Sequence, residues 1–214
     1  MKNKINILTR TANRPIGFSY CNKSITDQTY TNYEQLVSYD DKADLTNYIS
    51  NYNITPIYVD RDEIIKNDNI PSPGTGKYSP HNLYCNDLLA NVTDGYIMFL
   101  DDDDMLIDNT VLEQINNSIV DEDTMLFWKM RYPNGNTLPR VHGEFIAPML
   151  GNIGSPCFLV HVKWAKKFTW DGWKCGDFRY IKKVFSEVPN FKWLDKTFIQ
   201  LNNHGDHGNK NDLK

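Results

Sequence analysis

The sequence is poor in cysteine, has no surplus of basic residues and contains no long apolar run. Its four cysteines are widely spaced and form no CxxC pair, so we expect reduced and mostly buried thiols, as in cytoplasmic proteins. No segment approaches the roughly 20 apolar residues that span a bilayer, and no secretory leader pattern precedes the first predicted strand. We therefore expect a soluble, cytoplasmic protein without a membrane span.

The charge pattern argues against nucleic acid as a partner. The 214 residues carry a formal net charge of −4 and show no basic stripe. An anionic ligand would therefore need local positive groups or a metal ion. Hydrophobic residues make up 40% of the chain and aromatic residues 13%, which suffices for a real core. Since no internal repeat or interdomain linker is visible, we expect one domain.

Short apolar strands alternate with helical patterns through the first hundred residues. The predicted strands are residues 5–9, 33–39, 54–59 and 96–100, and helical patterns lie between them. This alternation predicts an α/β fold with parallel pairing and right-handed crossovers. The second half predicts a hairpin at residues 124–136, short strands at 157–160 and 197–201, and a helix with Asp177 as its N-cap.

The predicted strand 96–100 ends abruptly in four carboxylates, which we call the acidic cluster: Asp101, Asp102, Asp103 and Asp104. Adjacent carboxylates repel one another and lose hydration when they approach a sheet edge. A divalent cation would relieve this repulsion, and carboxylate oxygens suit Mg²⁺ or Mn²⁺. The alternative is a solvated acidic turn that leads into the next helix, with Asp108 as the N-cap.

Other polar residues also follow predicted strands. They are Thr9, Arg10, Asp40, Asp41 and Asp60. In an open α/β sheet, ligands bind outside the carboxyl ends of the strands. We therefore expect these residues and the acidic cluster to converge on one crevice.

Two other motifs fit less well. Residues 74–77, Gly-Thr-Gly-Lys, look like part of a phosphate loop, but they lack its full spacing and do not directly follow a strand. Asp101 and Asp103 also match the Asp-x-Asp of haloacid dehalogenase phosphohydrolases. Against that reading, Met105 stands where Thr or Val is expected, the motif lies mid-chain, and position 181 is Ile where a later Asp is expected.

Several segments, in order, resemble glycosyltransferase family 2. They are the opening strand with Thr11-Ala12-Asn13-Arg14-Pro15, the stretch from Ser24 to Glu34, the pair Asp40-Asp41, Asn86, the acidic cluster as an L-D-x-D-D motif, and Gly176-Asp177. Cys85 stands where the family has Arg before Asn86, and one acidic residue is missing before Asp177. The resemblance implies a GT-A fold: a Rossmann-like, mostly parallel sheet flanked by helices, with a small antiparallel and irregular portion on the acceptor side.

The resemblance also implies a nucleoside-diphosphate sugar donor, most simply a UDP-sugar, and a bound Mn²⁺ or Mg²⁺. The implied nucleotide-binding residues are Thr9, Arg10, Arg14, Asp40, Asp41, Asp101 and Asp102. Asp103 is the first choice as metal ligand, assisted by Asp104 or Asp101, and His204 or His207 of the polar tail is a further candidate for the metal or phosphate. The alternative of a non-catalytic nucleotide-sugar binder stays open.

On the acceptor side, the resemblance implies an inverting transfer to a hydroxyl of a glycan, glycoprotein or lipid. Asp177 is the expected general base. Trp170 and Trp173 are expected to stack on sugar rings. The Q-x-x-R-W signature of processive synthases is absent, which favours transfer of single sugars. We divide the expected domain into a nucleotide-binding half (1–105), an acceptor-side half (106–203) and a polar tail (204–214), and further domains of a longer polypeptide remain an alternative.

Overall fold

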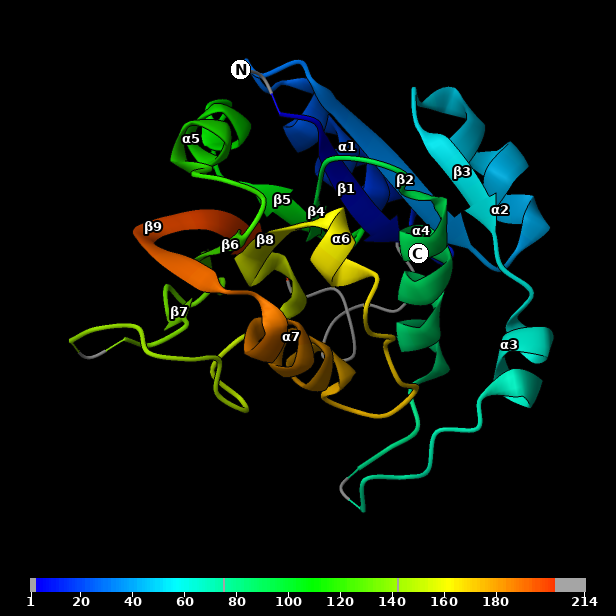
Figure 1. Ribbon diagram of the computed structural model, residues 1–214. Coiled ribbons are helices and arrows are strands. Elements are labelled where there is room, and N and C mark those ends of the chain that lie inside the picture. The colour runs from blue at the N-terminus through cyan, green and yellow to red at the C-terminus, as the bar shows by residue number, and fades with distance from the viewer. Residues whose placement is uncertain (1–2, 75, 142, 203–214) are drawn as a thin grey trace.

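The computed structural model describes residues 3–74, 76–141 and 143–202, which form an α/β fold around one sheet (Figure 1). The strand order is β3-β2-β1-β4-β8-β6-β9-β5, and β7 pairs with β6. The strands are β1 (Ile5–Arg10), β2 (Tyr33–Tyr39), β3 (Thr55–Tyr58), β4 (Tyr96–Phe99), β5 (Asp104–Leu106), β6 (Thr124–Arg131), β7 (Thr137–Leu138), β8 (Phe158–His161) and β9 (Asn190–Leu201).

Helices connect these strands and cover the sheet. They are α1 (Pro15–Thr26), α2 (Lys42–Asn47), α3 (Arg61–Asn67), α4 (Tyr84–Asn91), α5 (Val111–Ser118), α6 (Val162–Ala165) and α7 (Gly176–Glu187). Single 3₁₀ turns lie at η1 (Ile49–Asn51), η2 (Pro80–Leu83) and η3 (Ser155–Cys157). None of the helices in the described residues is long and apolar enough to cross a bilayer.

The first half is the predicted parallel sheet. β1 pairs in parallel with β2 on one side and with β4 on the other, and β2 pairs in parallel with β3. β1 and β4 are buried on both faces, which explains their nearly continuous apolar sequences. The chain returns from β3 at one edge to β4 beside β1, so the strand order reverses between β1 and β4. Ligands of such sheets bind at this switch point.

The second half adds antiparallel pairing, as the resemblance implied. β8 runs antiparallel to both β4 and β6, which joins the two halves into one sheet. The β6–β7 hairpin forms as predicted, and Gly135 adopts φ +84° in its turn. β9 begins seven residues before the predicted strand at 197, since its first part also pairs in parallel with β6. This first part of β9 is largely exposed and has no continuous apolar pattern, so the sequence did not predict it.

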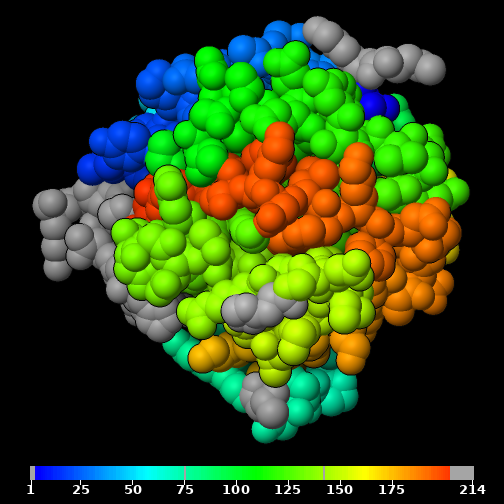
Figure 2. Space-filling model, turned by 90° about the vertical axis from the view of Figure 1, so that its left-hand side faces the viewer, coloured from blue at the N-terminus to red at the C-terminus, as the bar shows by residue number. Residues whose placement is uncertain are grey.

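An irregular segment, residues 139–154, follows β7 and lies on the face that Figure 2 shows, beside β9. Phe145 holds it to the sheet, with its ring stacked on that of Trp193 at 4.9 Å between centroids. Further along, Ile146, Met149 and Leu150 are exposed. The segment is therefore held to the sheet through Phe145, while its middle part stays exposed.

One helix was not predicted, and two predicted N-caps need correction. α3 was not anticipated; it starts because the Asp60 carboxylate accepts hydrogen bonds from the backbone N–H groups of Asp62 and Glu63. The N-cap of α5 is Thr110, not Asp108. The N-cap of α7 is Cys175, not Asp177, so Asp177 lies in the first turn. The expectation of free thiols is confirmed for all four cysteines, three of which are buried.

Candidate active site at the sheet switch point

A pocket of about 460 Å³ lies at the carboxyl ends of β1 and β4. The residues after β1 and the acidic cluster after β4 form two of its walls, and the starts of α3 and α4 complete it. Its lining residues are Arg10, Thr11, Ala12, Arg14, Arg61, His81, Tyr84, Asp101, Asp102 and Asp103. Of the residues expected to converge on one crevice, Arg10, Asp101, Asp102 and Asp103 line this pocket, and Arg14 lines it as well.

Arg10 and Asp101 form a bidentate ion pair across the β1–β4 boundary. Nη2 of Arg10 lies 2.7 and 2.8 Å from the two carboxylate oxygens, and Nε lies 3.0 Å from Oδ1. The remaining nitrogen, Nη1, donates to Oδ1 of Asn82 at 3.1 Å. Both side chains of the pair are largely buried, with 15% and 28% exposed. The pair therefore fixes the direction of the Asp101 carboxylate.

Arg14 supplies the second positive charge of the pocket. Its Nη1 lies 2.9 Å from Oδ1 of Asp102 and 3.7 Å from Oδ2 of Asp103. Thr11 donates its hydroxyl to Oδ2 of Asp102 at 2.9 Å. Burial raises the pKa of Asp102 to about 7, although Arg14 opposes this shift. Three of the four aspartates of the acidic cluster are buried, so the alternative of a solvated acidic turn is wrong.

Asp104 lies behind the pocket and does not line it. It starts β5 and pairs with Leu201. Burial and the neighbouring Asp103 raise its pKa well above the usual range, so its charged form is disfavoured. This position argues against Asp104 as a direct metal ligand and for Asp103, which faces the pocket.

The donor set of the pocket fits a divalent cation only if the ligand contributes oxygens. Among residues 3–74, 76–141 and 143–202, no three His, Cys, Asp or Glu side chains are grouped to hold a metal by themselves. Mg²⁺ is commonly held by one or two carboxylates, with substrate phosphates and water completing its shell. Asp103 and Asp101 on the pocket wall suit that arrangement. His204 and His207 lie outside the described residues.

The predicted convergence fails for some strand-end residues. Thr9 is fully buried and its hydroxyl accepts from Nε2 of Gln35, so it cannot contact a nucleotide in this conformation. Asp41 caps α2. Asp60 caps α3 and faces another cavity, so it does not join the crevice. Each of these side chains makes a structural hydrogen bond instead of facing the crevice.

Asp40 reaches the pocket through its partners. Its Oδ2 accepts from the Tyr84 hydroxyl at 2.6 Å and from Nη1 of Arg61 at 3.3 Å, and both partners line the pocket. The sequence argument missed Arg61 and Tyr84. Arg61 directly follows the strand-end Asp60, so the same strand-end reasoning could have included it.

Asp177, the expected general base, lies on the first turn of α7. Its Oδ1 accepts from the backbone N–H of Phe178 at 2.8 Å. Burial raises its pKa, while the Phe178 amide and the positive charge of Arg10 lower it. The charges of Arg10 and Asp101 act on this carboxyl group, although Asp177 is not among the residues that line the pocket.

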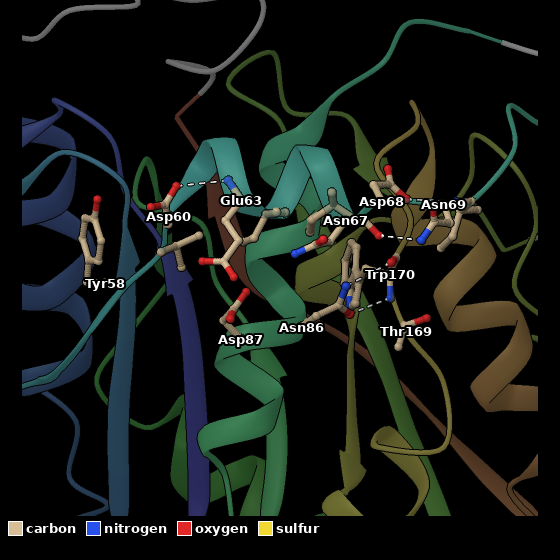
Figure 3. Close-up of a pocket in the computed structure, with 14 residues that line it drawn as sticks. Tyr58, Asp60, Glu63, Asn67, Asp68, Asn69, Asn86, Asp87, Thr169 and Trp170 are labelled. Carbon is tan, nitrogen blue, oxygen red and sulfur yellow. Dashed lines mark hydrogen bonds between the residues drawn. The ribbon is translucent and has the colours of Figure 1, made fainter.

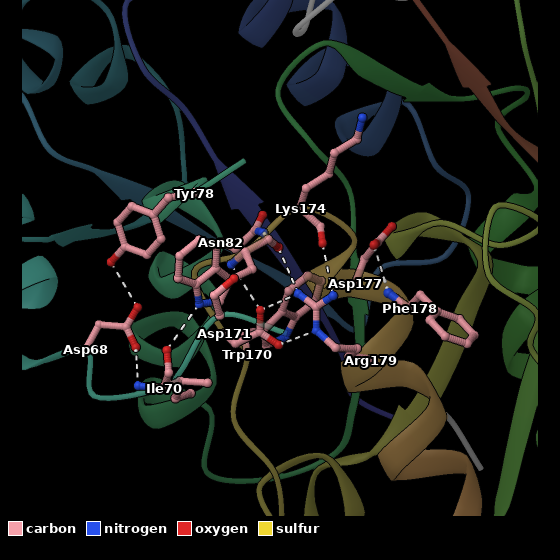
Figure 4. Close-up of polar contacts among 12 residues, drawn as sticks. Asp68, Ile70, Tyr78, Asn82, Trp170, Asp171, Lys174, Asp177, Phe178 and Arg179 are labelled. Carbon is pink, nitrogen blue, oxygen red and sulfur yellow. Dashed lines mark hydrogen bonds and ion pairs between the residues drawn. The ribbon is translucent and has the colours of Figure 1, made fainter. Parts of the chain in front are cut away.

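The aromatic loop, residues 170–176, leads into α7 (Figure 4). Trp170 is only 1% exposed, and its ring stacks on Tyr180 at 4.9 Å. It offers no free face to a sugar, so the expected stacking role of Trp170 is wrong. Trp173 is half-buried; its Nε1 donates to the Ile70 carbonyl and its ring meets Tyr78 edge-on.

A second, larger cavity of about 810 Å³ lies between α3, α4 and residues 169–170 (Figure 3). Its lining includes several acidic and amide side chains, and Glu63 and Asp87 point toward one another in Figure 3. Asn86 does not face it freely, since its amide clamps the backbone of Trp170 through two hydrogen bonds. The cavity has no arginine in its lining, which distinguishes it from the switch-point pocket.

No protein-family model and no curated protein matches this sequence. Solved structures match it in fold. S. aureus TarS in complex with UDP-GlcNAc gives a TM-score of 0.69 at 19% identity, covering 97% of this chain and 61% of that chain. A mannosyltransferase, PcManGT from Pyrobaculum calidifontis in complex with GDP-Man and Mn²⁺, gives 0.63 at 10% identity, covering 97% and 59%.

These similarities define the class of fold. The chain has the GT-A fold of glycosyltransferases, which confirms the architecture that the family resemblance implied. This chain spans about three fifths of the length of those two structures. A longer TarS structure is matched over 36% of its length, with a TM-score of 0.66.

Proposed function

We propose that this protein is a glycosyltransferase that moves a single sugar from a nucleoside-diphosphate sugar, most simply a UDP-sugar, to an acceptor hydroxyl. One observation carries the proposal. The switch-point pocket of a GT-A fold presents Asp101 and Asp103 together with Arg14. Carboxylates suit a metal-bound diphosphate, and the Arg14 guanidinium suits the negative charge of the phosphates.

The donor side is assigned to the pocket and its rim. Asp40 would accept from the base N–H group, which suits uracil. Arg14 would turn from Asp102 and Asp103 to a diphosphate oxygen, since its pairing with Asp103 is already long at 3.7 Å. Asp102 holds Arg14 in place until then.

A divalent cation would be held by Asp103 with Asp101, and in the tail His204 or His207 remains a proposed further ligand. When bound, it supplies positive charge that stabilises the diphosphate leaving group. Mn²⁺ and Mg²⁺ both suit oxygen ligands of this kind.

Asp177 is the proposed general base. It accepts the proton of the acceptor hydroxyl while that oxygen attacks the anomeric carbon from the side opposite the diphosphate, so the product has inverted configuration. Its raised pKa makes it a stronger base than an ordinary Asp, and the positive charge of Arg10 opposes this shift. Residues 106–203 would form the acceptor-side half, with the half-buried Trp173 as one wall.

Thermal unfolding in the presence of nucleotides tests the donor assignment. UDP with Mn²⁺ should raise the melting temperature of the wild-type protein, and EDTA should remove most of this increase. Asp103→Ala should lose the metal-dependent part, whereas Asp27→Ala, at the exposed end of α1, should keep it. Equal stabilisation by UDP in EDTA would contradict the metal site.

A further inference from the structure

Arg10 has no donor group left for a nucleotide. Its Nε and Nη2 are directed at Asp101, and Nη1 is directed at Asn82, with the His81 carbonyl at 3.4 Å. Its guanidinium carbon also lies 5.9 Å from the centre of the buried Trp170 ring, within the range of a cation–π contact. Four residues, Asp101, Asn82, His81 and Trp170, therefore surround the guanidinium. A direct role in binding the diphosphate would break at least one of these contacts.

Asn82 continues the connection from Arg10 to the aromatic loop. It is buried, and its Nδ2 donates to the Trp173 carbonyl at 3.0 Å (Figure 4). The same carbonyl accepts from the backbone N–H of Gly176 at 2.9 Å and from Nη2 of Arg179 at 3.0 Å. Gly176 is the first residue of α7, so this carbonyl fixes the place where the helix begins.

Close packing strengthens this connection. A Cβ atom on Gly176 would lie 3.0 Å from Nδ2 of Asn82 and 2.9 Å from the Asp171 carbonyl oxygen. The start of α7 therefore lies directly against the Asn82 amide, and Asp177 is the next residue. A continuous series of short contacts runs from the Asp101 carboxylate through Arg10 and Asn82 to the residue beside Asp177.

We propose that Arg10 is a positioning residue that couples Asp101, on the donor side, to the loop and helix that place Asp177 on the acceptor side. The coupling is a property of the fold; only its kinetic consequence rests on the proposed function.

Hydrogen exchange tests the coupling without any substrate. In Arg10→Gln, the backbone amides of residues 173–177 should exchange roughly tenfold faster, because the contact that holds Asn82 against the loop is lost. Asn82→Ser removes the loop contact but leaves the Arg10–Asp101 pair, and it should have the same effect; in the double variant the two effects should not add. The matched control is Arg131→Gln, which removes an exposed arginine whose Nε donates to Gln200. Unchanged protection of residues 173–177 in Arg10→Gln would overturn the proposal, whatever the result for Asn82→Ser.

Steady-state kinetics separates positioning from direct donor binding. Arg10→Gln and Asn82→Ser should each lower kcat by about 10- to 100-fold, the scale expected for misplaced catalytic groups, with KM for the UDP-sugar changed less than about threefold. Arg10→Lys should recover less than half of the loss in kcat, because a single ammonium nitrogen lacks the planar fork of donors with which Arg10 spans Asp101 and Asn82. A tenfold rise in KM at unchanged kcat in Arg10→Gln would show direct donor binding and overturn the proposal. An inactive wild-type protein would instead contradict the proposed function, and the exchange experiment would still decide the coupling.

Discussion

Buried Asp102 should make the metal-free protein less stable as the pH rises. Its pKa is about 7 in the folded state, against 3.8 for an ordinary Asp, and its side chain is only 4% exposed. Between these two values the folded protein binds a proton that the unfolded chain has released. The free energy of unfolding therefore falls with rising pH in this window.

The size of the effect follows from the two pKa values. One pKa unit corresponds to about 1.4 kcal/mol, so the contribution of Asp102 should fall by roughly 2–3 kcal/mol between pH 5 and pH 8. Asp104 adds to this slope in the same direction, because its pKa is also raised. His161 opposes it, since its pKa is lowered and the unfolded chain binds the extra proton near pH 6.

Asp102→Asn isolates the contribution of Asp102 from the other groups. Urea unfolding in EDTA at pH 5, 6, 7 and 8 should show a shallower decline for the variant than for the wild-type protein, with a difference of roughly 2–3 kcal/mol accumulated across the range. Thr11 can still donate to the asparagine oxygen, so the fold should persist. Identical slopes for the two proteins would refute the reasoning that burial holds Asp102 near neutrality.

Three further predictions concern separate parts of the site. Asp177→Asn should keep donor affinity, measured by calorimetry with UDP and Mn²⁺, while transfer slows by about 10² or more; a normal transfer rate would exclude this base. Gly172→Ala should lower the melting temperature and loosen the aromatic loop, because the new Cβ would meet Tyr78 at 2.7 Å and Asp68 at 2.8 Å; an unchanged temperature would show that this contact relaxes freely. Deleting the residues after position 203 should weaken UDP binding at an unchanged melting temperature, and unchanged binding would remove both tail histidines from the site.

The sequence was sufficient for the parallel half of the fold because its strands carry a strong signal. β1 and β4 are buried on both faces, so their apolar runs stand out, and the polar residues behind them mark the carboxyl edge of the sheet. Arg10 and Asp103 were found in this way. The switch between β1 and β4 then brings segments about ninety residues apart into one pocket.

The remaining parts depend on tertiary contacts that no local pattern shows. Trp170 and Trp173 look alike in sequence, yet one ring is stacked inside the core and the other lies at the loop surface. Thr9 and Asp60 sit at strand ends, but the hydroxyl of the first faces Gln35 inside the protein and the second caps a helix. Strand-end position therefore predicts the edge of the sheet better than it predicts the direction of a side chain.

The most direct test of the proposed function is the release of UDP from a panel of UDP-sugars by purified protein with Mn²⁺, followed by NMR of the transferred sugar. The account predicts release that depends on Mn²⁺, loss of this release in Asp103→Ala, and an anomeric configuration inverted relative to the donor. Release of inorganic phosphate from simple phosphomonoesters, or tight binding of UDP-sugars without any turnover across a broad set of acceptors, would contradict it.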